Sequence, residues 1–320
     1  MSDPETVGER GEFGLIEAIG RRLPQGKQVL VPPGDDAAVV LIDGVPIVVT
    51  TDVLVSGVHF RTDWGDASDI GRRAAAASLA DLVAMGAKPA ALVVALVTPE
   101  ATESAWVMRL ADGVRDEAAL VKASVVGGDL SSGDQLTVTV TGIGSMQGRE
   151  PVLRSEAQPG DQVAIAGRLG WAEAGLAVLS RGFGTPRALV DAYRRPEIDY
   201  GVALRAAASD VHAMCDVSDG LLADLGHIAR ASDVSINVDS SLVDVADPVA
   251  DVASAYGADP LTWVLGGGHD HAFAATFAAK KRLPKGFVRI GEVIESSEGG
   301  PAVTVDGKVW QASSGHAHFG

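Results

Sequence analysis

The chain has 320 residues, with 26 Lys and Arg against 42 Asp and Glu, which gives a formal net charge of −16. Because phosphate backbones and anionic membranes are bound by clustered Lys and Arg, this charge argues against a nucleic-acid or membrane-surface partner. With 47% hydrophobic residues the chain lies outside the composition of disordered proteins, and its length predicts two domains or one large one.

The cysteine content and the apolar runs indicate the compartment. The single cysteine, Cys215, cannot form an intrachain disulfide and fits a reducing compartment. The longest purely apolar run, residues 90–97, is far shorter than the ~18 residues of a membrane span. Residues 1–10 are polar and acidic, without the basic start and apolar region of a signal peptide. We therefore expect a cytoplasmic protein without a membrane partner.

Short runs rich in β-branched residues alternate with helix-like stretches, which predicts an α/β or α+β fold. Strands are expected at residues 37–41, 46–51, 91–96, 123–126, 136–143, 162–166, 234–238, 272–277, 288–293 and 302–305. Helices are expected at residues 70–85, 98–121, 170–180, 196–208 and 219–231.

Several of the predicted helices have recognisable ends. Asp66, three residues before Asp69, marks the start of the first helix, and Gly86 marks its end. Pro99 is expected to open the second helix, because proline is favoured in the first turn. Ser218 is expected to be the N-cap of the last helix.

A stretch rich in turn residues divides the predicted elements into two blocks. Residues 146–161 contain two glycines and two prolines, which is typical of a connection between regular elements. We therefore predict two domains, at residues 1–150 and 151–320.

Six aspartates stand in apolar or glycine-rich sequence, where an uncompensated charge is costly. They are Asp36, Asp52, Asp81, Asp129, Asp216 and Asp219. Asp36 and Asp52 adjoin predicted strands, and Asp129 follows two glycines that allow a ligand to approach the backbone. Asp216 and Asp219 bracket a strand-to-helix junction. Asp81 lies in an alanine-rich helix whose neighbouring turns offer no Lys or Arg.

These aspartates allow two interpretations. Taken singly, each fits the preference of Asp for turns, strand ends and helix N-caps. Taken together, strand-end carboxylates are the usual ligands of Mg²⁺, which accepts oxygen donors and is often shared with substrate phosphates. Several Mg²⁺ ions would also bring the positive charge that a chain of net charge −16 lacks. The pattern therefore predicts a site for several Mg²⁺ ions and a nucleotide phosphate.

Other phosphate-binding patterns are weak. The sequence contains no P-loop ending in Gly-Lys-Ser/Thr and no dinucleotide fingerprint after its first strand, and a lone triple glycine at 266–268 adds little. Arg154, just after the predicted boundary, is placed to reach a phosphate as a bidentate donor. An exposed loop arginine explains the same position equally well, so both interpretations stay open.

Histidines and the cysteine offer competing chemistries. His269 and His271, and again His316 and His318, are two residues apart, a spacing that places each pair on one face of a strand. Such pairs would suit a transition metal, or a solvated edge strand. Cys215 lies in apolar sequence that places no base beside it, which favours a buried structural thiol over a nucleophile.

Seven short motifs carry a resemblance to a known family. They are GDDAAV at residues 34–39, TTD at 50–52, GVHF at 57–60, SLADLVAMGA at 78–87, GGD at 127–129, DVSDGL at 216–221 and DL at 224–225. In order and spacing along nearly the whole chain, they resemble thiamine-monophosphate kinase. A wider superfamily shares the ATP and metal scheme in looser form, including aminoimidazole ribonucleotide synthetase, selenophosphate synthetase and a hydrogenase-maturation dehydratase.

The resemblance implies a two-domain fold like that of aminoimidazole ribonucleotide synthetase. The N-terminal strands would join those of a second subunit in a dimeric β-barrel, and the C-terminal domain would cover the site. Mg²⁺ ligation is implied for Asp36, Thr50, Thr51, Asp52, Asp81, Asp129, Asp216 and Asp219. Of these, Asp52, Asp129 and Asp219 are expected to be catalytic. Arg154 and Ser218 are expected to bind ATP, and His59 to lie near the thiamine phosphate.

Two positions on the substrate side depart from the family's pattern. Where the family has Gly-Gly-Gly-Glu-Asp-Tyr, residues 266–271 read GGGHDH, so His269 replaces an acidic contact. Where the family has Gly, an aromatic residue, any residue, His and Phe, residues 315–319 read GHAHF, so His316 replaces a stacking aromatic. Both histidines are still expected to contact the thiamine end of the acceptor.

The implied reaction is direct in-line transfer of phosphate from ATP to thiamine monophosphate, giving thiamine diphosphate and ADP. A phosphate monoester has a second pKa of ~6, so the attacking oxygen is already anionic and needs no strong general base. Metal ions that bridge the two phosphates would relieve their repulsion. Two alternatives stay open: another ATP-dependent superfamily enzyme, of selenophosphate-synthetase or amidine-forming type, and a noncatalytic regulator that binds metal or nucleotide.

Overall fold

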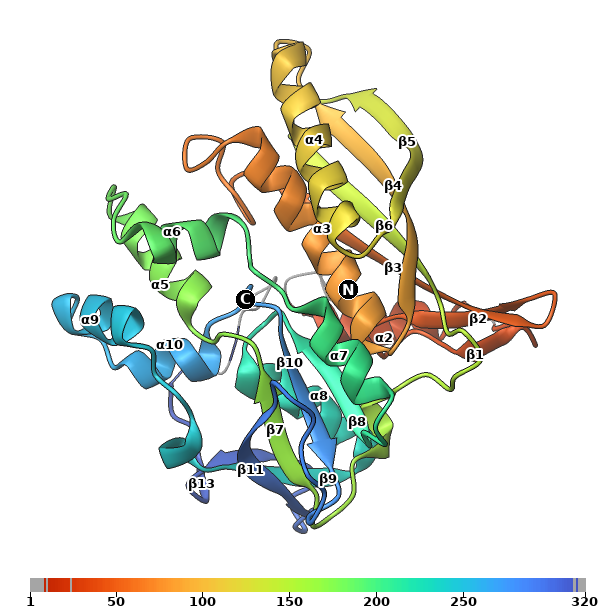
Figure 1. The fold of residues 1–320 in the computed structure, drawn as a ribbon, viewed down its shortest axis with the longest axis vertical. Helices are drawn as coiled ribbons and strands as arrows, with labels where there is room; N and C mark the ends of the chain where they lie inside the picture. Colours follow the sequence, from red (N-terminus) through yellow and green to blue (C-terminus); the bar gives the residue numbers. More distant parts are fainter. Residues whose placement is uncertain (1–8, 10, 24, 313–314, 316–320) are drawn as a thin grey trace, which may run out of the picture.

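The computed structural model describes residues 9, 11–23, 25–312 and 315, and it consists of two α/β halves, each built on its own sheet (Figure 1). This mixed two-part architecture confirms the predicted fold class.

Six strands of the N-terminal half form the first sheet. They are β1 (Val29–Val31), β2 (Ala38–Ile42), β3 (Val45–Val55), β4 (Lys88–Thr98), β5 (Ser124–Ser132) and β6 (Thr137–Ser145), in the spatial order β1-β2-β3-β6-β4-β5. Neighbouring strands are antiparallel except β4 and β5, which are parallel. A short helix, α2 (Glu12–Gly20), precedes β1, and the long helices α3 (Ala67–Ala84) and α4 (Ser104–Leu120) cover one face of the sheet (Figure 1).

Two glycines let α3 and α4 touch through their backbones. The helix α3 begins with a capping box at Asp66. A Cβ at Gly71 would lie 2.1 Å from the carbonyl oxygen of Leu110, and a Cβ at Gly113 would lie 2.1 Å from that of Ser68. Any side chain at either glycine would push the two helices apart. This close contact fixes the position of α3, which carries Asp81, over the sheet.

The opposite face of the first sheet is not covered by the described residues of the chain. Along β6 the side chains alternate, with Val138 and Val140 buried against the helices and Thr139 and Thr141 on the other face. On β3, Val53 is 48% exposed, and all nine residues of β5 are exposed. The sheet therefore leaves one face and one long edge strand open.

Seven strands of the C-terminal half form the second sheet. They are β7 (Gln162–Ala166), β8 (Ala213–Val217), β9 (Val234–Val238), β10 (Ala272–Phe277), β11 (Val288–Glu295), β12 (Val303–Val305) and β13 (Lys308–Val309), in the spatial order β13-β12-β9-β11-β7-β10-β8. The helices of this half are α5 (Trp171–Ser180), α6 (Arg187–Arg194), α7 (Tyr200–Ala207), α8 (Leu221–Ser232), α9 (Asp247–Ala255) and α10 (Pro260–Gly266), with short 3-10 helices at η1 (Arg154–Glu156) and η2 (Ser240–Leu242).

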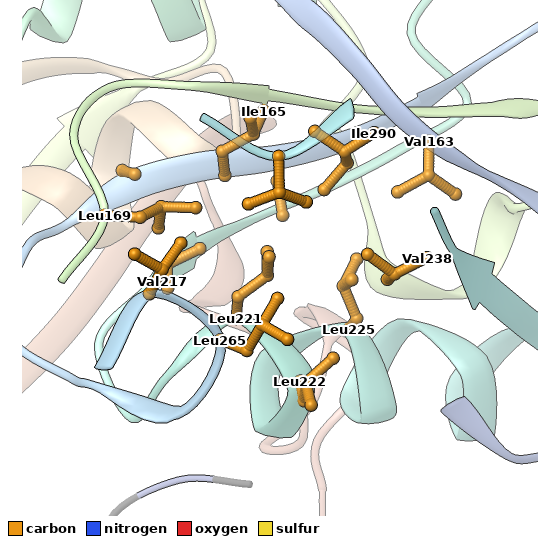
Figure 2. Packing of buried hydrophobic residues seen from close by; sticks show 14 of the residues in the cluster. Val163, Ile165, Leu169, Val217, Leu221, Leu222, Leu225, Val238, Leu265 and Ile290 are labelled. Atoms are coloured by element: carbon orange, nitrogen blue, oxygen red, sulfur yellow. The ribbon is translucent and has the colours of Figure 1, made fainter. Parts of the chain in front are cut away.

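One face of the second sheet packs on α8. Leu221 and Leu225 of this helix lie against Val217 and Ile165 of the sheet in a continuous apolar cluster (Figure 2). Their spacing of four residues places both leucines on one helix face. This cluster forms the core of the C-terminal half.

The other face of the second sheet packs on the N-terminal half. Met214 of β8 and Phe273 of β10 belong to the same apolar cluster as Leu79 of α3. All residues of β7, β8 and β10 are consequently buried. Because strand side chains alternate, Asp216 shares the face of Met214 and points toward the N-terminal half. The shared core thus brings a carboxylate of one half to the other.

The ten predicted strands all overlap observed strands, and the predictions at 162–166, 234–238 and 272–277 match β7, β9 and β10 residue for residue. Three strands (β1, β8 and β13) and four helices (α2, α6, α9 and α10) have no counterpart among the predicted elements. The predicted start of α4 at residue 98 is wrong, because β4 continues to Thr98 and a turn follows before Ser104. Among the described helices, none combines the length and apolarity needed to cross a membrane.

Candidate active site

Three carboxylates from distant parts of the sequence meet where the two halves join. Asp36 precedes β2, Asp81 lies in α3 and Asp216 lies in β8, and each offers an oxygen atom within 4.8 Å of those of the other two. Asp36 and Asp216 are only 8% and 2% exposed. We call these three residues the acidic cluster. It brings together three of the six aspartates singled out from the sequence.

Asp81 is held by a hydroxyl group of β3. Thr50 Oγ1 donates to Asp81 Oδ2 at 2.6 Å. Burial raises the pKa of Asp81 well above its usual range, and the neighbouring carboxylates of Asp52 and Asp216 raise it further. A carboxylate in such surroundings is stabilised by any nearby positive charge, either a proton or a metal ion.

Asp52 is positioned by a serine of α3. Ser78 Oγ donates to Asp52 Oδ2 at 2.6 Å and also lies 3.0 Å from the carbonyl oxygen of Val140. Burial raises the pKa of Asp52, and the hydrogen bond from Ser78 lowers it. Ser78 is absent from the predicted site residues. Its place three residues before Asp81, on the same helix face, is the signal that could have found it.

Asp36 is bound by an arginine of the C-terminal half. Arg154 Nε donates to Asp36 Oδ1 at 3.1 Å, and Nη2 makes a second, short contact with the same oxygen. The backbone N–H of Arg154 donates to Asp35 Oδ2 at 2.9 Å. The arginine side chain is only 17% exposed. The alternative of an exposed loop arginine is therefore wrong.

The donor set of the acidic cluster fits a hard divalent cation. Mg²⁺ prefers oxygen ligands, and carboxylates this close repel one another unless a cation or a proton lies between them. Asp36 Oδ2 is buried and has no hydrogen-bond partner among the described residues. Burial raises the pKa of Asp36 to about 8, even beside Arg154. Asp36, Asp81 and Asp216 could therefore hold Mg²⁺, with Thr50 and Asp52 beside them.

His271 binds a member of the acidic cluster. Its Nδ1 lies 2.9 Å from Asp216 Oδ2, and both side chains are buried. The prediction that His269 and His271 share a strand face is wrong. Both residues have positive φ angles, 69° and 50°, before β10 begins at Ala272. His269 instead lines a separate cavity, so this pair does not form a transition-metal site.

Ser218 and Asp219 lie in the loop that leads into α8. The predicted N-cap role of Ser218 is wrong, because Gly220 occupies the N-cap position. The backbone N–H groups before the helix are bound by Asp224 instead. Its Oδ2 accepts from the N–H groups of Asp219 and Gly220, each at 3.1 Å. Asp224 thus fixes the loop that carries two predicted site residues.

A second group of possible metal ligands surrounds the same loop. Asp219, Asp224 and His227 offer ligand atoms within 4.8 Å of one another. Burial raises the pKa of Asp224 well above its usual range. Burial lowers the pKa of His227 to about 4, with Arg154 and Arg230 acting in the same direction. The imidazole is therefore neutral at neutral pH, the form that can bind a metal.

Two predicted metal ligands lie apart from the acidic cluster. Side chains alternate along β3, so Thr51 points to the face opposite Thr50 and Asp52, where its hydroxyl lies 3.1 Å from that of Thr141. Asp129 is exposed on β5, with β6 and β4 lying between this strand and β3. Three strand spacings correspond to about 14 Å. Within one chain, neither side chain joins the cluster.

A cavity of about 350 Å³ is lined in part by residues 266–269, which lead from α10 to β10. Its walls include Phe60, Trp64, Glu173, Tyr193, Trp263 and His269. The backbone N–H of His269 donates to the carbonyl oxygen of Ser218 at 2.7 Å, which connects the cavity wall to the loop of predicted ATP ligands. We call this space the aromatic cavity. Glu173 is absent from the predicted site residues, and no sequence motif marks it.

His59 lies behind one wall of the aromatic cavity. Its Nδ1 accepts from the backbone N–H of Val55 at 3.0 Å, and its carbonyl oxygen accepts from the Tyr193 hydroxyl at 3.3 Å. The residue is 9% exposed.

Cys215 lies in the interior of the C-terminal half. Cys215 is fully buried in β8, and burial raises the pKa of its thiol well above the usual range. A thiol in this state is structural, as predicted. His316 and His318 lie outside the described residues, so their roles stay predictions.

Family models and individual relatives match the chain to one protein family. The model of the AIR synthase related protein N-terminal domain matches residues 34–146, and that of the C-terminal domain matches residues 158–303. The chain is 43% identical to thiamine-monophosphate kinase of Mycobacterium tuberculosis H37Rv, with 100% of this chain and 95% of the relative covered. It is 34% identical to thiamine-monophosphate kinase of Escherichia coli K12, with 97% and 98% covered.

Solved structures agree with these matches. AaThiL complexed with AMPPCP and TMP superimposes with a TM-score of 0.90 at 31% identity, covering 99% of this chain and 100% of that chain. Hydrogenase maturation protein HypE in complex with ATP superimposes with a TM-score of 0.66 at 20% identity, covering 86% of each chain, and shares the fold.

Proposed function

The chain belongs to the thiamine-monophosphate kinase family of AIR synthase related proteins, and we propose that it transfers the γ-phosphoryl group of ATP to the phosphate of thiamine monophosphate. The products are thiamine diphosphate and ADP. The chain is thus a phosphotransferase whose acceptor is itself a phosphate group.

The acidic cluster carries this proposal, and residues 269–271 connect it to the aromatic cavity. Phosphoryl transfer between two polyanions requires cations at the point where they meet. Asp36, Asp81 and Asp216 offer oxygen atoms within 4.8 Å of one another, which suits Mg²⁺. A chain of net charge −16 would recruit its positive charge in this way.

The acceptor needs little chemical activation. Its phosphate has a second pKa of ~6 and is mostly dianionic at neutral pH, so an oxygen can attack without a strong base. When bound, Mg²⁺ would neutralise charge on the nucleotide and acceptor phosphates. Asp52, oriented by Ser78, and Asp219, whose backbone N–H is bound by Asp224, extend the proposed ligand set. The protein's task is then to hold both phosphates in line.

Arg154 and Ser218 are the proposed contacts to ATP. Arg154 binds Asp36 through Nε and Nη2. Because a guanidinium carries five N–H donors, other N–H groups of Arg154 can bind a phosphate oxygen. Ser218 lies at the loop whose N–H groups are organised by Asp224. This loop precedes α8, where a helix N-terminus favours anions.

The thiamine end of the acceptor is assigned to the aromatic cavity. We propose that His269 on its wall and His59 behind it contact or position this end, together with His316 from the C-terminal segment. The aromatic side chains of Trp64 and Trp263 suit the flat rings of thiamine.

We further propose that the active protein is a homodimer joined through the first sheet. β2 pairs with β3 only as far as Val49, so the segment Thr50–Leu54 has no partner on that edge among the strands that the structure describes. β5 likewise has no partner on its outer edge among the described strands. Two copies could close a barrel by pairing β5 of each with β3 of the other, which would satisfy both edges.

This arrangement gives a role to Asp129. Within one chain it lies about 14 Å from Asp52, too far to share an ion. Pairing of β5 with the partner's β3 would bring Asp129 of the partner subunit beside Thr51 and Asp52. We therefore assign the predicted metal and catalytic role of Asp129 to the neighbouring subunit's site.

We place the domain boundary at residues 150 and 151, and the matches at 34–146 and 158–303 support it from either side. We assign the reaction to the cytoplasm because ATP is the donor and the single cysteine suits a reducing compartment.

The proposed reaction is tested by incubating the protein with Mg²⁺ and ATP, with and without thiamine monophosphate, and identifying the products by mass spectrometry. Thiamine diphosphate should form only when Mg²⁺, ATP and the acceptor are all present. ADP release with another acceptor, or none with this one, would refute the substrate assignment.

A further inference from the structure

Glu173 places a carboxylate in the aromatic cavity without a partner among the described residues. The residue lies in the first turn of α5, where a Cβ at Gly267 of the facing loop would lie 2.7 Å from the Cβ of Glu173. Its carboxylate forms no hydrogen bond or ion pair with the described residues, and burial alone raises its pKa. A half-buried charge in this position is costly unless a ligand compensates it.

Glu173 is not needed to begin α5. Acidic residues in a first turn commonly bind the free N–H groups of the helix. In α5 this function belongs to Asp270, whose Oδ1 accepts from the backbone N–H of Ala172 at 2.8 Å. The same contact ties the loop that carries His269 to the start of α5. Glu173 is therefore held against the cavity with its carboxylate available.

The arginine that lines the cavity is already neutralised. Arg61 donates to both oxygens of Asp63, at 3.0 and 2.8 Å, and its guanidinium lies 5.0 Å from the ring centre of Trp64. It therefore does not compensate Glu173. The cavity combines aromatic walls, including the edge-to-face pair of Trp64 and Tyr193 at 5.8 Å, with an uncompensated carboxylate.

Aromatic faces and a carboxylate together select an aromatic cation. The thiazolium ring of thiamine carries a permanent positive charge and no N–H group, so a protein recognises it by charge and stacking. We propose that Glu173 is the specificity-determining residue that binds this charge, an inference that rests on the proposed kinase function. Glu173 on α5 supplies a negative charge to the cavity, whereas His269 on the facing loop does not.

The test measures equilibrium binding of two acceptors by calorimetry in the presence of Mg²⁺ and a non-hydrolysable ATP analogue. One acceptor is thiamine monophosphate, and the other is an analogue whose thiazolium is replaced by an uncharged thiophene ring. Glu173→Gln, which keeps size and removes charge, should weaken binding of thiamine monophosphate about 10-fold and leave the neutral analogue nearly unchanged. The KM for ATP should not move. Glu292→Gln, on the half-exposed strand β11, is the matched control and should behave as wild type.

The possible outcomes test the role of Glu173 and the proposed kinase function separately. If Glu173→Gln binds the two acceptors in the same affinity ratio as wild type, the inference is wrong while thiamine diphosphate formation still stands. If Glu173→Gln weakens the binding of both acceptors equally, the residue shapes the cavity without recognising the charge of the ligand, and the inference is also wrong. Failure of the wild type to form thiamine diphosphate in the activity assay would overturn the proposed function and this inference with it.

Discussion

Arg154 donates hydrogen bonds to Asp36, and this contact joins the two halves of the chain at the candidate active site. Arg154 follows the turn between the halves, and its Nε lies 3.1 Å from Asp36 Oδ1. The contact occupies one carboxylate oxygen, while Asp36 Oδ2 remains buried without a hydrogen-bond partner among the described residues. One residue thus serves both the contact between the halves and the acidic cluster.

Stability without metal should fall as the pH rises. Burial raises the pKa of Asp36 from its ordinary 3.8 to about 8, so the folded state keeps a proton that the unfolded state releases. The contribution of such a group is fully present below the unfolded pKa and is lost as the pH approaches the folded pKa. We expect the Tm of the protein in EDTA to decrease between about pH 5 and pH 8, as measured by circular dichroism.

Mg²⁺ should remove most of this pH dependence, because a bound cation replaces the proton. The increase in Tm on adding Mg²⁺ should be larger near ~pH 8 than near ~pH 6. Asp81→Asn removes one charge from the acidic cluster and should reduce both the pH dependence and the response to Mg²⁺. An equal Mg²⁺ effect at both pH values in the wild type would argue against metal binding at the cluster.

Ser78→Ala should weaken Mg²⁺-dependent activity without unfolding the protein. The substitution removes the 2.6 Å hydrogen bond that orients Asp52. Loss of a group that orients a metal ligand typically costs about 10- to 100-fold in affinity or activity. We expect the Mg²⁺ concentration for half-maximal rate to rise, with a smaller effect at saturating Mg²⁺. Ser68→Ala, at the start of the same helix, should leave the Mg²⁺ dependence unchanged.

Tyr200→Phe should reduce stability and leave the chemistry intact. The Tyr200 hydroxyl donates to Glu117 Oε1 at 2.7 Å, and Arg72 Nε donates to the other oxygen at 2.9 Å, which ties α7 to α4 and α3. Because Glu117 is buried, losing one donor should cost about 1–3 kcal/mol in the free energy of unfolding. Denaturant titration measures this loss. A large decrease in kcat with unchanged stability would show that the contact serves the active site.

Strand periodicity explains which site residues the sequence could place. Thr50 and Asp52 are two residues apart, so both face α3, whereas Thr51 between them must face away. The same rule applied to Met214 would have placed Asp216 toward the N-terminal half. A strand-to-helix junction was expected at Asp216, but no residue range was predicted for β8, so the direction of the Asp216 side chain was not predicted. Motif and periodicity together therefore predict the acidic cluster, provided that the strand is recognised.

Contacts between elements remote in the sequence explain what could not be predicted. Asp224 replaces Ser218 in serving the start of α8, because the loop turns through Gly220 at φ 133°. Glu173 reaches the aromatic cavity only because Gly267 approaches it across the fold. Neither relation leaves a periodic pattern. The α/β class and the division into two halves followed from β-branched runs and turn residues, whereas these two contacts required the packed structure.

The location of Asp129 makes a prediction that depends on the dimer. Asp129 is exposed on β5, while Asp52 lies three strands away in the same chain. Asp52→Asn and Asp129→Asn should each abolish turnover as homodimers, because each removes a proposed ligand. If the ligand is shared between subunits, a mixed dimer would contain one intact site, formed by Asp52 of one subunit and Asp129 of the partner subunit.

Mixing equal amounts of the two inactive variants under subunit exchange should restore activity. Random pairing makes half of the dimers mixed, each with one functional site of two, so the mixture should recover about a quarter of wild-type activity. Thiamine diphosphate formation measures the recovery, and size-exclusion chromatography with light scattering verifies the dimer. A mixture of Asp52→Asn with Asp81→Asn should stay inactive, because both residues belong to the site of one chain. If the Asp52→Asn and Asp129→Asn mixture also stays inactive although exchange occurs, Asp129 does not act across the interface.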